Sequence, residues 1–220
     1  MPIVTGRTYT DFIDQPLLET VALASTSPRR RELLASLGLR VLVVPSTYVE
    51  EPLAGIGPRE TALIHARSKA AGVGAAEHVV VAADTVVDID GEALGKPGDT
   101  AEARAMLRRL SGRWHAVHTG FALRAPQTDA SFSDVLTTRV RFADLNDRTL
   151  DAYAASGDGL DKAGAYGIQG FAATLVERLE GDYFTVVGFP LAAFAAALPQ
   201  IGYRLLPPQA LRRLSGATHA

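Results

Sequence analysis

A run of hydroxyl and arginine side chains lies between an expected strand and an expected helix early in the chain. Residues 25–31 read Ser-Thr-Ser-Pro-Arg-Arg-Arg. The free N–H groups and positive dipole end of a helix attract anions there, and forked guanidinium groups suit phosphate. A simpler interpretation is a capped helix with a solvated basic first turn, but cations at that end oppose the helix dipole. The segment therefore favours phosphate binding, with Ser25, Ser27, Arg29 and Arg30 as candidate ligands.

Acidic side chains that follow expected strands could hold a metal ion or activate water. Asp84 comes shortly after residues 78–82, which are apolar on both faces and predict a central strand. Ligands of open α/β sheets bind beyond the carboxyl ends of strands, where a carboxylate can hold a metal. Glu50 and Glu51 follow another expected strand, and one of them near Asp84 would complete a magnesium site. The alternatives are a turn-forming aspartate and two solvated loop acids.

Two lysines and a glycine-rich loop are further candidates. Lys69 lies in the middle of an expected helix, whereas Lys96 lies between Gly and Pro, which restrict its backbone. Lone lysines are usually solvated, so neither is assigned by its position alone. Residues 161–170 combine glycines with a charge pair, Tyr166 and Gln169. Such a loop can hold a nucleotide base by stacking and hydrogen bonds, or it can be a simple glycine-rich turn.

Composition excludes several classes of protein. The chain has no Cys, so it has no disulfide, thiolate zinc site or cysteine nucleophile. Its formal net charge of −2 argues against binding to duplex nucleic acid, which usually needs a basic excess. The longest apolar stretch, 189–198, is about half a membrane span, and the N-terminus lacks a signal-peptide pattern. We therefore expect a cytoplasmic protein that has no membrane partner and no stable nucleic-acid partner.

Strand and helix patterns alternate along the chain, which indicates an α/β protein with a mixed sheet. His115 and His118 lie three residues apart on an expected strand and should face opposite sides, so a metal pair there is not expected. The expected helices are 28–37, 58–71, 99–110, 146–155 and 190–198. The expected strands are 20–24, 41–44, 78–82, a hairpin over 86–95 around Asp90-Gly91, 114–123, 131–142, and 174–179 with 184–187 around a Glu180-Gly181 turn.

Taken in order, these segments resemble the Maf family of nucleoside triphosphate pyrophosphatases over residues 20–200. The motifs that carry the resemblance are 23–30 (Leu-Ala-Ser-Thr-Ser-Pro-Arg-Arg), Lys69-Ala70, 83–87 (Ala-Asp-Thr-Val-Val), 94–97 (Leu-Gly-Lys-Pro), 110–120, 161–170 and 187–190 (Val-Gly-Phe-Pro). The resemblance implies an elongated, two-lobed α/β fold, similar to inosine triphosphatases, with a mixed sheet flanked by helices and a central cleft. It also implies one domain over 20–200, with an N-terminal extension over 1–19 and a C-terminal tail over 201–220.

The resemblance assigns roles to the candidate residues. Asp84 is similar to the family's general base, and Glu50 to its metal-side acid, with Glu50 and Asp84 as metal ligands. Glu50 is preferred to Glu51 from the ungapped spacing to Arg30. The remaining assignments are phosphate contacts by Ser25, Arg29, Arg30, Lys69 and Lys96, and base choice by Arg29, Thr85 and Gln169, as in the branch that prefers dTTP and UTP. The sequence departs from the family pattern at Ile64-His65, where an Arg-Leu pair is common, and at the Thr-Tyr-Val before Glu50.

The expected function is hydrolysis of a nucleoside triphosphate, dTTP, UTP or a modified pyrimidine nucleotide, to the monophosphate and pyrophosphate. A divalent metal, Mg²⁺ or Mn²⁺, is the implied cofactor, a homodimer the implied assembly, and housecleaning of the nucleotide pool the implied role. One alternative is a nucleotide-binding regulator of cell division or septum formation without turnover, which would not need Asp84 beside a polyanion. Another is a nucleotidyltransferase, but its usual glycine-rich signature is missing.

Overall fold

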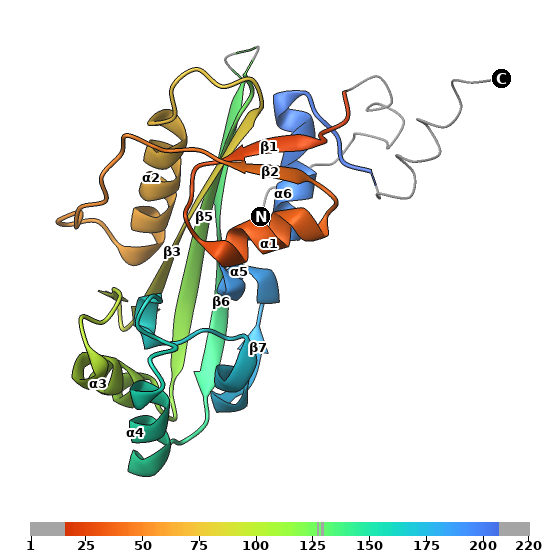
Figure 1. Cartoon of the computed structure of the whole chain (residues 1–220). Helices are drawn as coiled ribbons and strands as arrows, with labels where there is room; N and C mark the ends of the chain where they lie inside the picture. The colour runs from red at the N-terminus through yellow and green to blue at the C-terminus, as the bar shows by residue number, and fades with distance from the viewer. Residues whose placement is uncertain (1–15, 127, 129, 207–220) are drawn as a thin grey trace.

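The structure is a computed structural model that describes residues 16–126, 128 and 130–206 (Figure 1). Most of the predicted N-terminal extension (1–19) and of the predicted C-terminal tail (201–220) lies outside the described residues. The described ends of the chain lie side by side. The backbone N–H of Leu18 donates to the carbonyl of Arg204 over 2.9 Å, and the N–H of Arg204 donates to the carbonyl of Pro16 over 3.2 Å.

A mixed seven-stranded sheet forms the centre of the described fold, as the sequence predicts. The strand order is β2-β1-β3-β5-β6-β7, and β4 pairs with β3. β1 is parallel to β2 and β3, whereas the remaining neighbours are antiparallel. The strands are β1 (Thr20–Leu23), β2 (Arg40–Val43), β3 (Val79–Ile89), β4 (Glu92–Leu94), β5 (Trp114–Arg124), β6 (Ser131–Phe142) and β7 (Val176–Glu180).

Helices cover this sheet, and some of them begin at residues whose side chains cap the helix. Asp99 Oδ1 accepts a hydrogen bond from the N–H of Glu102, and Asn146 Oδ1 accepts one from the N–H of Thr149. Ser27 is the N-cap residue of the first helix, but its side chain makes no capping bond. The α-helices are α1 (Pro28–Ser36), α2 (Pro58–Ala71), α3 (Thr100–Leu110), α4 (Asp147–Ala155), α5 (Tyr183–Val187) and α6 (Leu191–Ala197). Short 3₁₀ helices cover Ala163–Ala165, Gly170–Leu175 and Leu198–Ile201.

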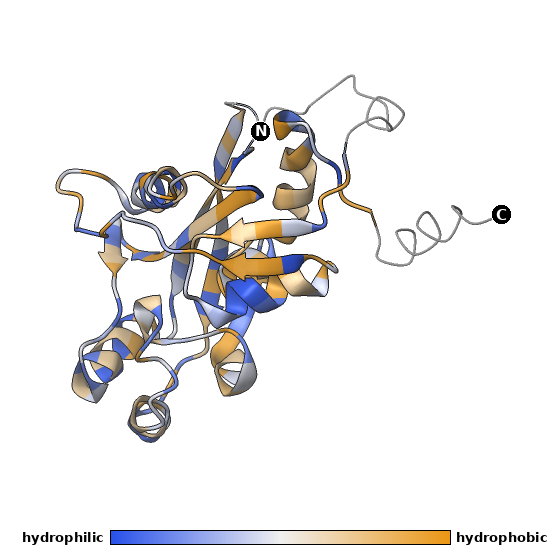
Figure 2. Ribbon diagram, turned by 45° about the horizontal axis from the view of Figure 1, so that its top comes forward, coloured by the Kyte–Doolittle hydropathy of each residue, from blue (hydrophilic) through white to orange (hydrophobic). Residues whose placement is uncertain are grey.

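The molecule is elongated along its longest strands. Figure 1 shows β3, β5 and β6 running through the molecule, with α1, α2, β1 and β2 towards one end and α3 and α4 towards the other. Figure 2 shows mostly hydrophobic residues along β1 and β2 and hydrophilic residues in the adjoining α1. None of the described helices is long and apolar enough to cross a membrane.

The predicted strand over 184–187 is wrong, because these residues form helix α5. Asp182 caps this helix, and its Oδ2 accepts hydrogen bonds from the N–H of Thr185 over 2.7 Å and from the Thr185 hydroxyl over 2.8 Å. Gly188 ends it with a φ of 118°, a conformation that favours glycine. The β-branched run of Thr185, Val186 and Val187 favours a strand locally, but the signals at both ends outweigh it.

Asp84 lies within a strand and not beyond the end of one, which also differs from the prediction. β1 ends at Leu23, opposite Val81, but β3 continues to Ile89. The continuation is stabilised by antiparallel pairing with β5, in which Asp84 lies opposite Gly120. Asp84 is thus beyond the carboxyl end of β1 while still held by the sheet, so its backbone is fixed on one side and its side chain can face an opening.

Small residues bring α2 close to the sheet. Ala62, Ala66 and Ala70 are buried on the side of α2 that packs against β3 and β5. A Cβ atom on Gly120 would lie 2.3 Å from the carbonyl oxygen of Ala62, so only glycine permits this separation of helix and strand. This close packing places the side chains of α2 directly over the strand that carries Asp84.

Candidate active site

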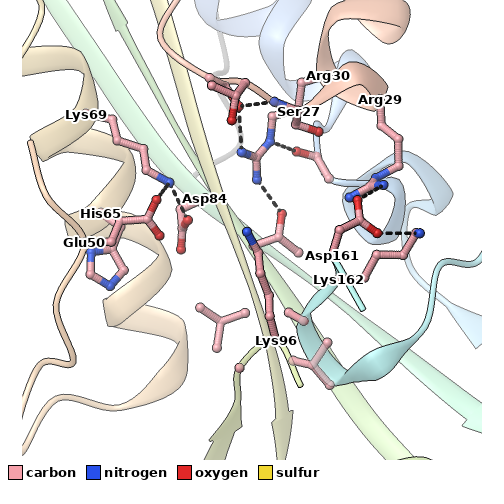
Figure 3. A pocket seen from close by; sticks show the side chains of 18 of the residues that line it. Ser27, Arg29, Arg30, Glu50, His65, Lys69, Asp84, Lys96, Asp161 and Lys162 are labelled. Carbon is pink, nitrogen blue, oxygen red and sulfur yellow. Dashed lines mark hydrogen bonds and ion pairs between the residues drawn. The ribbon is translucent and has the colours of Figure 1, made fainter. Parts of the chain in front are cut away.

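A cavity of about 1170 Å³ lies beside β3, and Figure 3 shows the side chains that line it. Its walls come from the start of α1, the loop after β2, α2, β3, the loop after β4, the 161–169 loop and the end of α5. All the site residues that the sequence predicts line it: Ser25, Ser27, Arg29, Arg30, Glu50, Lys69, Asp84, Thr85, Lys96 and Gln169. Segments separated by more than a hundred residues therefore contribute to a single cavity.

Two carboxylates converge on one ammonium group in this cavity. Lys69 Nζ lies 2.6 Å from Glu50 Oε1 and 2.7 Å from Asp84 Oδ1. The side chains of Lys69 and Asp84 are only 12% and 10% exposed, whereas Glu50 is 54% exposed. Partial burial tends to raise the pKa of Glu50, but the hydrogen bond and charge of Lys69 outweigh it, so this pKa is lowered. Of the two acids that the sequence left open, Glu50 forms the ion pair.

The same carboxylates are chemically suited to a divalent cation. Mg²⁺ is usually held by one or two carboxylates together with substrate phosphates and water, and Glu50 and Asp84 come from separate elements to a place where a cationic group already lies. Among the described residues, no group of three or more His, Cys, Asp or Glu side chains could hold a metal. The chain could therefore contribute two oxygen donors, leaving other positions for a bound ligand.

Arg30 is fixed by three hydrogen bonds beside these carboxylates. Its Nε donates to the carbonyl of Gly188 over 2.9 Å, and its two terminal nitrogens donate to Ser25 Oγ and Thr85 Oγ1, each over 3.1 Å. Burial lowers the pKa of the Arg30 guanidinium, while the charges of Asp84 and Glu50 oppose that shift. A guanidinium has five N–H groups, so one on each terminal nitrogen remains for an anion in the cavity.

A chain of hydroxyl groups continues from Arg30 into the sheet. Thr119 Oγ1 donates to the carbonyl of Thr185 over 2.7 Å. A hydroxyl has one hydrogen, so in the 2.9 Å contact between Thr119 and Thr85 the Thr85 hydroxyl must donate. Thr85 therefore accepts from Arg30 and donates to Thr119. The direction of every hydrogen bond from Arg30 to α5 follows from this.

The opposite wall carries a second ionic group. Arg29 lies 3.2 Å from Asp161 Oδ2, and Lys162 Nζ lies 2.7 Å from Asp161 Oδ1. Burial tends to raise the pKa of Asp161, but hydrogen bonds from Lys162 and Arg29 outweigh it, so this pKa is lowered. The Arg29–Asp161 contact joins the start of α1 to the 161–169 loop across the cavity. Lys96 and Gln169 line the same cavity with exposed side chains.

Two residues that the sequence does not assign to the site, Tyr48 and His65, line the cavity. The Tyr48 hydroxyl lies 2.8 Å from Nδ1 of His65, and this pair lines the cavity near Glu50.

His115 and His118 have separate partners, as their spacing predicts. His115 Nε2 lies 2.7 Å from the Tyr166 hydroxyl, and His118 Nδ1 lies 2.8 Å from Thr137 Oγ1. Sequence spacing predicts that the two histidines diverge, but it carries no signal for their partners, which come from distant segments.

The sequence is similar to known proteins over most of its length. The family model described as "Maf-like protein" matches residues 20–201. The dTTP/UTP pyrophosphatase of Thermus thermophilus is 48% identical over 182 residues, 83% of this chain and 95% of the relative. The dTTP/UTP pyrophosphatase of Anaeromyxobacter dehalogenans is 47% identical over 187 residues, 84% of this chain and 95% of the relative. Among solved structures, a HAM1 protein from Coxiella burnetii has a TM-score of 0.41 at 18% identity, covering 90% of this chain and 97% of its own.

Proposed function

This chain belongs to the Maf-like family, and we propose that it hydrolyses dTTP and UTP to the nucleoside monophosphate and pyrophosphate. The relatives at 48% and 47% identity carry the name of that activity. The observation that carries the proposal is the arrangement of charge in the cavity. The fixed guanidinium of Arg30 and the ammonium of Lys69 line the same space as the carboxylate of Asp84 (Figure 3). Cations there bind a polyanion, and the carboxylate beside them provides a base.

The phosphate chain is bound by groups from three elements. The free N–H groups at the start of α1 and the hydroxyls of Ser25 and Ser27 face one side of it. Arg30 presents its two remaining N–H groups as a fork, which matches phosphate oxygens. Arg29, Lys69 and Lys96 add positive charge around the same cavity. This set neutralises a triphosphate without the glycine-rich loop that many nucleotide-binding proteins use.

A divalent cation, Mg²⁺ or Mn²⁺, completes the proposed site. Glu50 and Asp84 would hold it, since their carboxylates already meet at one cationic group. When bound, the ion would polarise phosphoryl oxygens and make bound water more acidic. Lys69 would then donate hydrogen bonds to the phosphates as well as to the carboxylates, because its ammonium group has three donors on a flexible side chain.

Asp84 is the proposed general base. Its carboxylate takes a proton from a water molecule while the oxygen of that water bonds to phosphorus. The bond between phosphorus and the oxygen that bridges the α and β phosphates breaks, which releases the monophosphate and pyrophosphate. The fixed backbone of β3 orients the carboxylate, and Lys69 donates to Oδ1. The remaining lone pairs of the two oxygens would accept from water and bind the cation. Lys96 and Arg30 stabilise the charge that develops on the leaving group.

Base selection is assigned to Gln169, Thr85 and Arg29. The Gln169 amide offers an N–H₂ group and a carbonyl, which can pair with a carbonyl and the imide N–H of a pyrimidine. A purine of different pattern leaves buried polar groups unpaired, which costs about 1–3 kcal/mol for each group. A preference of roughly ten- to hundredfold for dTTP and UTP over purine triphosphates follows.

The proposal extends to the organisation of the chain. We propose one Maf-like domain over residues 20–200, supported by the family match to 20–201, and a homodimer that acts in nucleotide-pool housecleaning. Sedimentation of the purified protein tests the dimer.

A regulator without turnover is not favoured. Binding alone does not need a carboxylate facing a polyanion, and the relatives are named as enzymes.

Product analysis tests the reaction. The purified protein is incubated with dTTP, UTP, ATP, GTP or methylated GTP in the presence of Mg²⁺ or Mn²⁺, and the products are separated. We expect monophosphate and pyrophosphate, formed fastest from dTTP and UTP. Release of orthophosphate would contradict the reaction, and a purine preference would contradict the base assignment. Binding of dTTP with no product would instead support the regulator.

A further inference from the structure

The 161–169 loop, which carries Gln169, packs against the sheet at Gly164. The N–H of Gly164 donates to the carbonyl of Gly95 over 3.0 Å. Gly164 has a φ of 69°, and a Cβ atom there would lie 2.9 Å from a methyl group of Val87, so the loop backbone packs directly on β3. Beyond Gly164 the loop has a buried aromatic side chain, Tyr166, three residues before Gln169.

Tyr166 connects this loop to β5. Its hydroxyl lies 2.7 Å from Nε2 of His115, and the two rings meet edge to face with centroids 5.4 Å apart. Phe142 closes the group, with its ring centroid 5.1 Å from His115 and 4.7 Å from Tyr166. Both members of the polar pair are nearly inaccessible, His115 with 4% and Tyr166 with 5% of its surface exposed. A buried hydrogen bond of defined direction therefore attaches the loop to β5.

The hydrogen-bonding capacity of His115 is incompletely used. Its Nδ1 is buried and has no hydrogen-bond partner within the described part of the chain. Burial lowers the pKa of His115 to about 4, so the ring is neutral near pH 7. If Tyr166 donates to Nε2, one N–H is left unpaired. If Nε2 donates instead, both Nδ1 and the phenol hydrogen lack partners among the described residues, so donation by Tyr166 is favoured.

A buried polar atom without a partner costs stability, so packing alone does not explain a histidine at this position. An apolar ring against Phe142 and the Tyr166 ring would fill the space without that cost. What the imidazole adds is a direction, because a hydrogen bond fixes where the phenol oxygen lies and apolar contact does not. The fixed phenol in turn restricts the backbone that leads to Gln169.

We propose that His115 is a positioning residue for base selection, which holds the 161–169 loop through Tyr166 in the conformation that presents Gln169 to the base. This inference rests on the proposed function. His115 does not contact the substrate in this proposal, and the hydrogen bonds and ion pairs that fix Arg30, Lys69 and Asp84 involve no residue of the 161–169 loop. Its loss should therefore reduce the discrimination between bases more than it reduces the hydrolysis of a poor substrate.

The direct test is Tyr166→Phe, which removes the hydroxyl and keeps the ring. We expect the ratio of kcat/KM for dTTP to that for ATP to fall about tenfold, the effect of one hydrogen bond, while kcat/KM for ATP changes less than about threefold. Amide hydrogen exchange over residues 161–169, measured without nucleotide, should become faster. An unchanged ratio, or unchanged exchange, would overturn the proposal. The exchange measurement stands even where the wild-type protein hydrolyses no triphosphate, so failure of the proposed function is recognised separately.

Two further variants separate positioning from general loss of stability. His118→Gln is the matched control, because His118 is a buried histidine on the same strand whose two ring nitrogens are bonded to Thr137 and Asp88, outside the loop. It should lower the melting temperature and leave the substrate ratio unchanged, and an equal fall in the ratio would contradict the proposal. The double variant His115→Phe with Tyr166→Phe removes both polar partners. We expect it to recover stability relative to Tyr166→Phe but not the ratio, whereas recovery of both would show that packing alone positions the loop.

Discussion

Lys69 and Asp84 form an ion pair of 2.7 Å between α2 and β3, inside a cavity whose other walls come from segments far apart in the sequence. The pair is largely excluded from solvent, so each charge depends on the other. Lys69 also contacts Glu50 at 2.6 Å, which means that neither carboxylate can change without affecting the same ammonium group.

Asp84→Asn should reduce turnover of dTTP by at least about 10²-fold, in line with the contribution of a general base. The amide keeps the shape of the side chain and an oxygen that can accept from Lys69, but it cannot take a proton. Lys69 retains Glu50 as an ionic partner, so the melting temperature should change little. Steady-state kinetics and calorimetry on the same preparation give both values. Turnover close to that of the wild type would rule out Asp84 as the base.

Gly120→Ala should impair the site by pushing α2 away from the face of the sheet that also carries Asp84. The added methyl group would lie 2.3 Å from the carbonyl oxygen of Ala62, so α2 must move away from β5 and carry Lys69 with it. Overpacking of this kind costs about 1–3 kcal/mol of unfolding free energy, and turnover should fall as well. Denaturant titration and kinetics measure the two effects. Gly74→Ala is a suitable control for an added methyl group, because that position has open space and a backbone conformation that alanine can adopt.

Arg30→Lys should weaken triphosphate binding and also destabilise the protein. Lysine keeps the charge, but it cannot make the three directed contacts to Ser25, Gly188 and Thr85 while presenting a fork to phosphate. The carbonyl of Gly188 then loses its charged donor, at a cost of about 1–3 kcal/mol. Titration calorimetry with a non-hydrolysable dTTP analogue measures the affinity. Arg31→Lys, at the next position along α1, is the control. Equal affinities for the Arg30 variant and the wild type would exclude Arg30 as a phosphate ligand.

The elements that the sequence predicts well are those with local signals at both ends. α2 begins at Pro58 and ends before Gly72 as its pattern indicates, and the turn at Asp90-Gly91 has positive φ at both positions, as its residue types favour. The strand expected over 184–187 is wrong, because Asp182 and Gly188 bound these residues as a helix despite their β-branched side chains. The capping bonds from Asp182 decide the structure there.

The site was predictable by residue type, but its connections were not. Arg30 and Asp84 are recognisable from their positions next to a strand. The extension of β3 past Asp84 was not, because the polar Asp84 and Thr85 interrupt the apolar pattern and the stabilising partner, β5, lies more than thirty residues away. The partners of Thr119 and His115 depend on how β5 is aligned with α5 and with the 161–169 loop. That alignment is set by tertiary packing and leaves no local pattern.

Stability should depend on pH through His115. Burial lowers its pKa to about 4 in the folded protein, against about 6.5 for an exposed histidine. Between these values the unfolded chain binds a proton that the folded protein does not, so stability falls as the pH is lowered through this window and levels off below it. From pH 7 to pH 5 the contribution of His115 is a loss of about 2 kcal/mol.

Urea titrations of the wild type and of His115→Phe at pH 7 and pH 5 test this dependence. The variant should lose about 2 kcal/mol less than the wild type between the two pH values, whatever its stability at pH 7. From pH 7.5 to pH 8.5 the two proteins should show the same change, which serves as the control. Equal losses of unfolding free energy in the two proteins between pH 7 and pH 5 would show that His115 has the same pKa in the folded and the unfolded chain.

Thr119→Val should weaken the hydrogen bond between Thr85 and Arg30 without changing a residue that lines the cavity. Thr119 is fully buried and gives its hydrogen to the carbonyl of Thr185, which obliges Thr85 to donate to Thr119 and to accept from Arg30. Valine keeps the shape but removes the acceptor, so the Thr85 hydroxyl is free to rotate and its hydrogen can turn towards the guanidinium. We expect KM for dTTP to rise about three- to tenfold, the effect of one weakened hydrogen bond, with a smaller change in kcat. Thr119→Ser retains the hydroxyl and should restore KM even if its lost methyl group lowers the melting temperature. A KM that follows stability across both variants, and not the presence of the hydroxyl, would refute this role for Thr119.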